Sequence, residues 1–304
     1  MCRALVTGGA GFIGSHLVDA LLLAGWEVRV LDDLSTGKVD NLDVNNVEFI
    51  QGDIRDPDAV NGAVQDVEVI FHQAAWRSIV RSIDMPVMST SVNIEGTIQV
   101  LESARQARVR RVVYAASSSA YGKRGAIPQV ETMPVSPQSP YALQKYTGER
   151  FCEIYTKLYG METVSLRYFN VFGPRQNPLG RYATVIPQFF KAAAEGKPPT
   201  IDGNGKQTRD FTYVSNVVRA NLLAANVPGI SGKMFNIGAG ARTSINKLWH
   251  LISTISGADP ACLYGPPRLG DIRDTFADLK RSRNLLGYSP TMTLEQGLSV
   301  VFGK

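Results

Sequence analysis

The sequence predicts an α/β fold in which helices cover both faces of a doubly wound parallel sheet, with a smaller mixed α/β subdomain in the C-terminal part. Over the first 170 residues, short apolar strand patterns alternate with helix patterns, as they do in such sheets. The first strand pattern runs into closely spaced glycines, and a helix pattern follows them directly. After residue 168, Gly, Pro and Asn become frequent and the regular alternation stops. This change marks where the second part of the fold begins.

The expected elements follow the apolar periodicity along the chain. Strands are expected at 4–7, 27–31, 47–53, 67–72, 109–115 and 162–168, and a later strand at 233–238 rejoins the sheet. Helices are expected at 15–24, 93–106, 141–158 and 213–225, followed by a helix capped by Thr243 and a short last helix near 294–298. The loops at 173–180 and 196–205 are long enough to predict functional segments.

The glycines Gly8, Gly11 and Gly14 lie between the first strand and the first helix. Glycine at this turn lets backbone N–H groups approach a pyrophosphate, and the helix N-terminus adds a partial positive charge. A glycine-rich turn without a ligand is the alternative, but the strand before it and the helix after it favour a Rossmann dinucleotide site. Asp32 ends the next strand, where a carboxylate grips the adenosine ribose and repels a 2′-phosphate. These residues predict bound NAD rather than NADP.

Two further segments are expected at the same dinucleotide site. Asp53 lies at the end of the third strand pattern and is placed to meet the adenine. Residues 73–75 follow the fourth strand pattern and are placed to pass under the pyrophosphate or the nicotinamide.

Tyr141 and Lys145 are four residues apart at the start of a helix pattern, so their side chains share one face. A lysine ammonium and the positive nicotinamide ring both favour tyrosinate, and we expect them to lower the pKa of Tyr141 by a few units from ~10. Such a phenol is a usable general base near neutral pH. For this spacing alone, an ordinary surface pair is the alternative. Ser117 at a strand end favours the catalytic interpretation, because its hydroxyl can hydrogen-bond the oxygen that Tyr141 deprotonates.

The composition argues against several other classes of protein. No apolar run approaches the ~20 residues that span a bilayer, and the first strand begins too soon for a signal peptide, so no membrane partner is expected. Cys2, Cys152 and Cys262 are scattered, which predicts reduced thiols in the cytoplasm with no disulfide and no metal. The net charge is +5, and the basic cluster at 105–111 fits a solvated helix end better than a nucleic-acid surface. An anionic small substrate explains the surplus more simply.

The glycine turn, Ser117, Tyr141 and Lys145, in this order, resemble the extended short-chain dehydrogenase/reductase family, and within it the NAD-dependent epimerases and dehydratases. The resemblance runs through essentially the whole chain. Within the family, the chain looks most like nucleotide-sugar 4-epimerases of the UDP-glucose or UDP-N-acetylglucosamine type. It also rests on the segments 93–97, 167–174, 208–214, 236–238 and 270–271. It implies 4-epimerisation of a UDP-hexose through a transient 4-keto sugar, with Tyr141 taking the 4-hydroxyl proton while NAD⁺ accepts the C4 hydride.

The resemblance implies three sets of site residues. The catalytic residues would be Ser117, Tyr141 and Lys145. The cofactor would bind Gly8, Gly11, Phe12, Ile13, Gly14, Asp32, Asp33, Ser35, Gly37, Asp53, Ile54, Gln73, Ala74, Ala75, Asn93, Tyr141, Lys145, Tyr168 and Val171. The nucleotide sugar would bind Ser78, Ser117, Ser118, Tyr141, Asn170, Thr184, Val185, Thr200, Arg209, Arg268, Asp271 and Thr275. Of these, the diphosphate would contact Asn170 and Arg209, the uridine end Arg268 and Asp271, and the uracil pocket Thr184 and Val185.

Several positions bear on the reaction and on the sugar. Related dehydratases and decarboxylases carry an acid where this chain has Ser118 and Ser119, so elimination lacks its proton donor. Thr275 stands where relatives restricted to plain hexoses can place a tyrosine, which predicts that N-acetylated sugars are tolerated. Trp76 and Arg77 depart from the family pattern: Trp76 is a core residue or part of the sugar site, and Arg77 binds a sugar carboxylate or hydroxyl or points to solvent. Epimerases of UDP-glucuronate or of GDP- or dTDP-sugars, and a non-catalytic NAD-binding relative, stay as alternatives.

The resemblance also implies how the chain is organised. An NAD-binding Rossmann domain is expected from residues 1–170 plus about 211–239, and a nucleotide-sugar-binding subdomain from about 171–210 plus 240–304. Relatives pair as homodimers through a four-helix bundle, to which the helices at 93–106 and 141–158 would contribute. The second of these carries the apolar series Phe151, Ile154, Tyr155 and Leu158, which faces either a partner subunit or the core.

Overall fold

The central sheet is doubly wound, as the sequence predicts. The structure, a computed structural model, describes residues 2–124, 127–177, 184–267 and 272–303. Within these residues seven parallel strands form one sheet, in the order β3-β2-β1-β4-β5-β6-β11. They are β1 (Arg3–Thr7), β2 (Glu27–Asp32), β3 (Glu48–Gln51), β4 (Val69–His72), β5 (Arg111–Ser117), β6 (Glu162–Tyr168) and β11 (Lys233–Ile237). The winding direction reverses between β1 and β4, so the crevice for a ligand lies there.

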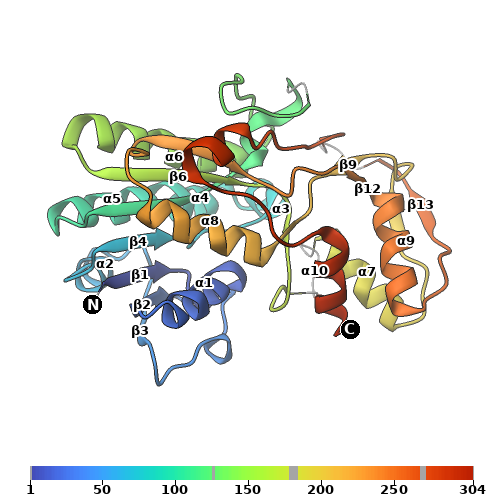
Figure 1. The fold of residues 1–304 in the computed structure, drawn as a ribbon, viewed down its shortest axis with the longest axis horizontal. Coiled ribbons are helices and arrows are strands. Elements are labelled where there is room, and N and C mark those ends of the chain that lie inside the picture. The colour runs from blue at the N-terminus through green and yellow to red at the C-terminus, as the bar shows by residue number, and fades with distance from the viewer. Residues whose placement is uncertain (1, 125–126, 178–183, 268–271, 304) are drawn as a thin grey trace.

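Helices cover both faces of the sheet because successive side chains of each strand point in opposite directions. In β1, Ala4 and Val6 join one apolar core with α1 (Phe12–Leu23) and α8 (Val214–Asn226). Leu5 joins the second core, which α2 (Pro57–Ala63), α5 (Gly96–Gln106) and α6 (Pro140–Tyr159) complete. Figure 1 shows α1 and α8 side by side over the first of these faces.

Helix α6 carries the predicted catalytic pair, and local chemistry fixes both of its ends. Ser139 is the N-cap, whose hydroxyl accepts a hydrogen bond from the Ala142 N–H at 3.2 Å, and Pro140 occupies the first turn. Gly160 ends the helix in the left-handed conformation, with φ of 69°. The backbone N–H of Tyr141 also donates to Ser82 Oγ at 3.0 Å. The catalytic end of α6 is therefore fixed to α3 (Ile79–Asp84), the helix that carries Ser82.

The helix predicted at 93–106 begins differently from the expectation. Helix α4 (Pro86–Thr90) continues into a π-helical turn at Ser91–Glu95, and α5 begins only at Gly96. Such turns widen a helix locally and are frequent at functional sites. This one contains Asn93, whose side chain supports a loop of the candidate site.

Apart from α8 and β11, the described residues after 168 hold short strands, three α-helices and a π-helical turn at Ser282–Leu286. The pairs are β7 (Val171–Phe172) with β10 (Thr212–Tyr213), β9 (Thr208–Arg209) with β12 (Thr243–Ser244), and β8 (Thr200–Asp202) with β13 (Leu263–Gly265). Figure 1 shows α7 (Val185–Ala194), α9 (Ile245–Ser256) and α10 (Leu294–Phe302) beyond the end of the main sheet. The predicted cap of α9 is wrong by one residue. Ser244 accepts from the Lys247 N–H, while Thr243 pairs with Arg209.

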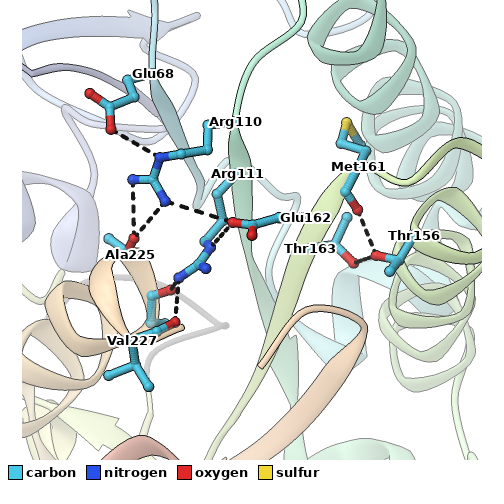
Figure 2. Close-up of polar contacts among 10 residues, drawn as sticks. Glu68, Arg110, Arg111, Thr156, Met161, Glu162, Thr163, Ala225 and Val227 are labelled. Atoms are coloured by element: carbon cyan, nitrogen blue, oxygen red, sulfur yellow. Dashed lines mark hydrogen bonds and ion pairs between the residues drawn. The ribbon is translucent and has the colours of Figure 1, made fainter. Parts of the chain in front are cut away.

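The basic cluster at 105–111 is only partly a solvated helix end, which corrects the prediction. Arg111 is buried in β5 and donates to Glu162 Oε2 at 2.8 Å. Its Nη1 donates to the carbonyl oxygens of Ala224 and Val227, both at 2.8 Å, at the C-terminal end of α8. Figure 2 shows Arg110 beside it, paired with Glu68 and with Glu162. These two arginines therefore anchor α8 to the sheet rather than serving as an open cationic surface.

Candidate active site

A cleft of about 370 Å³ opens where β1, β2, β4 and β5 reach their carboxyl ends. Its volume lies in the range of small-molecule sites. Most of the predicted cofactor residues line it, namely Gly8, Gly11, Phe12, Ile13, Gly14, Asp32, Asp33, Ser35, Asp53, Ile54, Gln73, Ala74, Ala75, Tyr141, Lys145 and Tyr168. Gly37, Asn93 and Val171 are not among its lining residues, and their contact with the cofactor stays a prediction.

The glycine turn fits a dinucleotide in a way that larger residues would prevent. Gly8 has a φ of +69°, which side chains other than glycine rarely adopt. A Cβ on Gly14 would lie 2.1 Å from the Gly8 carbonyl oxygen, so helix α1 approaches the turn only because Gly14 lacks one. Gly11 caps α1 without a side-chain hydrogen bond, which leaves N–H groups of the first turn for an anion. The turn therefore fits the pyrophosphate of NAD.

Asp32 is the last residue of β2 and lies beside the glycine turn. Its Oδ2 accepts from the Ala10 N–H and its Oδ1 from the Leu34 N–H, each at 2.9 Å. Burial raises the pKa of this carboxyl, and the two backbone hydrogen bonds oppose the rise. The carboxylate is thus fixed beside the glycine turn, where the ribose of an adenosine is expected.

Gln73 and Tyr168 meet in a buried polar network at the floor of the cleft. Gln73 Nε2 donates to the Tyr168 hydroxyl at 3.0 Å, and Asn221 Nδ2 donates to the same hydroxyl at 2.8 Å. Burial raises the pKa of Tyr168 to about 12, so its phenol stays neutral. These groups shape the cleft and do not serve as bases.

Tyr141 and Lys145 enter the cleft from α6, at the end farther from Asp32. Lys145 is buried, and its Nζ donates to the Ala115 carbonyl oxygen of β5 at 2.8 Å. Because β5 and β2 are separated in the sheet by β1 and β4, Tyr141 lies on the side of the cleft opposite the adenosine end. This is the side where the nicotinamide of a bound NAD is expected.

The protein groups around Tyr141 oppose the expected fall in its pKa. Burial raises the pKa of the phenol, and the charge of Arg77 and a hydrogen bond with Ser117 lower it by less. Burial also lowers the pKa of Lys145 to about 7, so its ammonium holds the proton weakly. The expectation also counted the nicotinamide charge, so a lowered Tyr141 pKa in the complex with NAD stays a prediction. NAD, when bound, supplies the hydride acceptor and a positive ring charge at this end.

The hydroxyl of Ser117 is oriented by a neighbour that the sequence analysis treated only as a missing acid. Ser119 donates twice to Ser117 Oγ, from its backbone N–H at 3.2 Å and from its hydroxyl at 2.8 Å. Since Ser117 Oγ accepts both bonds, its own proton is free to donate toward Tyr141 or a substrate oxygen. Ser117 and Ser118 are not among the lining residues of the cleft, although Ser117 hydrogen-bonds the Tyr141 side chain.

The loop that carries Trp76 and Arg77 is clamped to the π-helical turn. Asn93 Oδ1 accepts from the Trp76 N–H at 2.7 Å, and Asn93 Nδ2 donates to the Trp76 carbonyl and to Gln144 Oε1. Asn93 is therefore a support of this loop rather than a lining residue. Trp76 and Arg77 both line the cleft, and Trp76 belongs to neither buried core. Of the two alternatives for Trp76, the structure favours the site.

Of the predicted nucleotide-sugar residues within the described part of the chain, Tyr141 lines this cleft and the others do not. Thr275 and Asn170 are brought together, with Thr275 Oγ1 donating to Asn170 Oδ1 at 3.3 Å. Arg209 Nη1 donates to the Thr208 and Arg273 carbonyl oxygens. The others lie at element ends, with Thr184 and Val185 at the start of α7, Thr200 in β8, and Ser78 as the cap of α3. Arg268 and Asp271 fall outside the described residues.

Comparison with known proteins settles the family. Residues 4–238 match the family model described as the NAD dependent epimerase/dehydratase family. The chain belongs to the NAD-dependent epimerase/dehydratase family. The UDP-glucose 4-epimerase of Mycolicibacterium smegmatis is 42% identical over 304 residues, covering 98% of this chain and 96% of that protein.

Solved structures of family members superpose closely on this chain. A UDP-glucose 4-epimerase of Thermotoga maritima, solved with UDP-glucose, has a TM-score of 0.95 at 39% identity and covers 98% of this chain and 97% of that one. A UDP-N-acetylglucosamine 4-epimerase of Methanobrevibacter ruminantium, in complex with UDP-N-acetylmuramic acid, has a TM-score of 0.94 at 35% identity, with 99% and 96% covered. The Rossmann-like fold and NAD as cofactor of this family member follow from these matches.

Sequence reasoning missed several residues of this family member's cleft. Arg55 and Met88 line it from the loop after β3 and from α4, and Ser119 orients Ser117. Arg55 carried a signal, because it follows the predicted adenine contact Asp53 by two residues. Met88 carried none, since its position depends on how α4 packs across the sheet edge.

Proposed function

We propose that the chain interconverts the C4 epimers of UDP-hexoses, both plain and N-acetylated, with NAD as a resident cofactor. The observation that carries the proposal is the convergence of Tyr141, Lys145 and Ser117 on one side of the cleft, opposite the adenosine end. The family and the similarity to 4-epimerases support it.

In the proposed reaction, Tyr141 takes the proton of the sugar 4-hydroxyl as general base. Ser117 donates a hydrogen bond to the same oxygen, and the hydrogen bond from Ser119 orients the Ser117 hydroxyl. Lys145 favours the tyrosinate once the ligands exclude water. Bound NAD would supply the acceptor for the C4 hydride and its return to the other face. Between these steps the 4-keto sugar would turn about its diphosphate linkage, and Tyr141 would return the proton to give the opposite epimer. No net oxidation occurs.

The acidic residues of the cleft favour epimerisation over elimination. Among the described lining residues, the carboxylates are Asp32, Asp33 and Asp53, all at the carboxyl ends of β2 and β3. Beside Tyr141, Ser118 and Ser119 stand where related dehydratases carry an acid. A carboxylic acid that could protonate a leaving hydroxyl is therefore absent from this side of the described lining.

A product assay tests the function directly. The holoenzyme is incubated separately with UDP-glucose, UDP-N-acetylglucosamine, UDP-glucuronate and a dTDP-hexose, and the 4-epimers are separated by chromatography. Formation of UDP-galactose and UDP-N-acetylgalactosamine supports the proposal. Turnover confined to UDP-glucuronate or to the dTDP-sugar overturns the substrate assignment, and no turnover of any of them favours a non-catalytic relative.

We predict that Thr275→Tyr narrows the range of sugars. Thr275 is buried and donates to Asn170, and the family resemblance puts a tyrosine at this position in relatives restricted to plain hexoses. The variant is expected to lose about 10- to 200-fold in kcat/KM for UDP-N-acetylglucosamine, relative to UDP-glucose. Thr275→Ser is the matched control and keeps the ratio of the wild type. Equal ratios in Thr275→Tyr and wild type contradict the assignment.

We propose a homodimer formed through α5 and α6, on a face that differs from the predicted one. Tyr155 is buried and Phe151 packs against the core, whereas Leu143, Ile154 and Leu158 are exposed and share one side of the helix. Ile154→Glu is expected to shift the protein from dimer to monomer in sedimentation velocity. A wild type that sediments as a monomer at working concentration contradicts this proposal.

We also keep the predicted division of the chain as a proposal. The NAD-binding part comprises residues 1–170 plus about 211–239, and the nucleotide-sugar part about 171–210 plus 240–304. The place of β11 in the main sheet and the place of α7, α9 and α10 beyond it support this division (Figure 1).

A cytoplasmic location is proposed from three free thiols. Among the described helices, none is long and apolar enough to cross a bilayer.

A further inference from the structure

Arg55 crosses from the loop after β3 to helix α4, and two opposite contacts fix its side chain. Asp53 holds one side, because its Oδ1 accepts from the Arg55 N–H at 2.8 Å and from Nε at 3.0 Å. On the other side, Arg55 Nη1 lies 3.3 Å from Met88 Sδ. A guanidinium held in this way has little freedom to leave, although about a third of the side chain is exposed.

Arg55 and Met88 separate two hollows. Both line the cofactor cleft, and both also line a second hollow of about 530 Å³ on the outer side, between Asp84 and Ser91. The two side chains therefore form a partition between the cleft and the surface. Without them the cleft would open outward over α4.

The partition stands at the adenosine end of the cleft. Gly52, Asp53 and Ile54 follow β3 directly, and Asp32 ends the neighbouring strand β2. In a doubly wound sheet this edge receives the adenosine half of a dinucleotide. Tyr141 and Lys145 lie at the other end, so Arg55 stands away from the reacting groups.

Asp53 holds the Arg55 guanidinium with both carboxylate oxygens, which accept hydrogen bonds from Nε and Nη2. The expected contact of Asp53 with the adenine stays a prediction. The Arg55 hydrogen bond lowers the pKa of this carboxyl below its ordinary value, so it stays ionised and keeps its hold on the guanidinium. A planar guanidinium stacks well on an aromatic ring, and a thioether sulfur also packs favourably on one. A purine is such a ring.

We propose that Arg55, held by Asp53 and in contact with Met88, covers the adenosine half of bound NAD and slows its dissociation. The binding role follows from the NAD cleft alone. Its value for turnover rests on the proposed function, since an epimerase has to keep the reduced cofactor until the sugar ketone is reduced again.

The test compares NAD with ADP-ribose, which has the adenosine end but no nicotinamide. Each is titrated calorimetrically into protein freed of NAD, for wild type, Arg55→Ala and Arg55→Lys. Arg55→Ala is expected to raise the Kd of both ligands by about tenfold. Arg55→Lys restores part of the affinity through its charge. Arg105→Ala is the matched control and changes neither Kd, because Arg105 pairs with Glu102 on the exposed side of α5.

An unchanged Kd in Arg55→Ala contradicts the proposal. A weaker affinity for NAD without a matching weaker affinity for ADP-ribose contradicts it as well. If Arg55→Ala does not fold, Met88→Ala opens the partition from the other side and is expected to raise both Kd values. An unchanged Kd in Met88→Ala then overturns the proposal. These readouts use binding only, so they stay distinct from a failure of the proposed epimerase reaction.

Discussion

Tyr141→Phe is expected to lose 4-epimerase activity by about 10²- to 10⁴-fold in kcat, the range that a positioned general base contributes. The change removes one oxygen and leaves the ring in place, so the cleft keeps its shape. Burial raises the pKa of Tyr141, and the charge of Arg77 and a hydrogen bond with Ser117 oppose the rise, so the proposed base depends on the further positive charge that bound NAD would supply. Steady-state kinetics with UDP-glucose across pH measures the effect.

Two controls distinguish a loss of catalysis from a loss of bound NAD. NAD content of the purified variant is expected to match wild type, since the glycine turn and Asp32 lie at the other end of the cleft. Tyr146→Phe is the matched control, one turn further along α6 and outside the cleft, and should retain full activity. Full epimerase activity in Tyr141→Phe, with the expected NAD content, would contradict the assigned base.

The main sheet could be predicted because its signals are local. The apolar run of β6 matches its predicted bounds at 162–168, and Gly11 and Gly14 pack against Gly8 within the same turn. Lys145 and Tyr141 share a helix face by spacing alone. Wherever contacts are made within one strand, one turn or one helix, the residue pattern carries enough information.

The errors arise where contacts are distant in sequence or where burial outweighs charge. Asn93 hydrogen-bonds Gln144, which lies fifty-one positions later in the sequence. The residue pattern does not show that the Asn93 amide also binds the backbone of Trp76. Arg111 fell in an apparently basic surface cluster, yet its partners come from β6 and α8. Burial raises the pKa of Tyr141, a contribution that the residue spacing does not reveal because desolvation depends on packing.

Arg167→Met is expected to destabilise the protein by about 3–5 kcal/mol, because it leaves a buried charge without its partner. Arg167 in β6 and Glu149 in α6 are both almost completely buried. Arg167 Nε donates to Glu149 Oε2 at 2.8 Å, and Nη2 donates to Oε1 at 2.7 Å. The guanidinium also lies 4.6 Å from the ring centre of Tyr121. Urea unfolding of the ligand-free variant measures the loss.

A double variant distinguishes the charge left behind from the pair itself. Arg167→Met with Glu149→Leu removes both charges, so it is expected to recover much of the stability that the single variant loses. Arg105→Met breaks an exposed pair with Glu102 and is expected to change little. If Arg167→Met unfolds at the wild-type urea concentration, the ion pair does not hold α6 against β6. The position of Tyr141 would then depend on the other contacts of α6, among them the Ser139 cap, the Ser82 contact and the bond from Lys145 to Ala115.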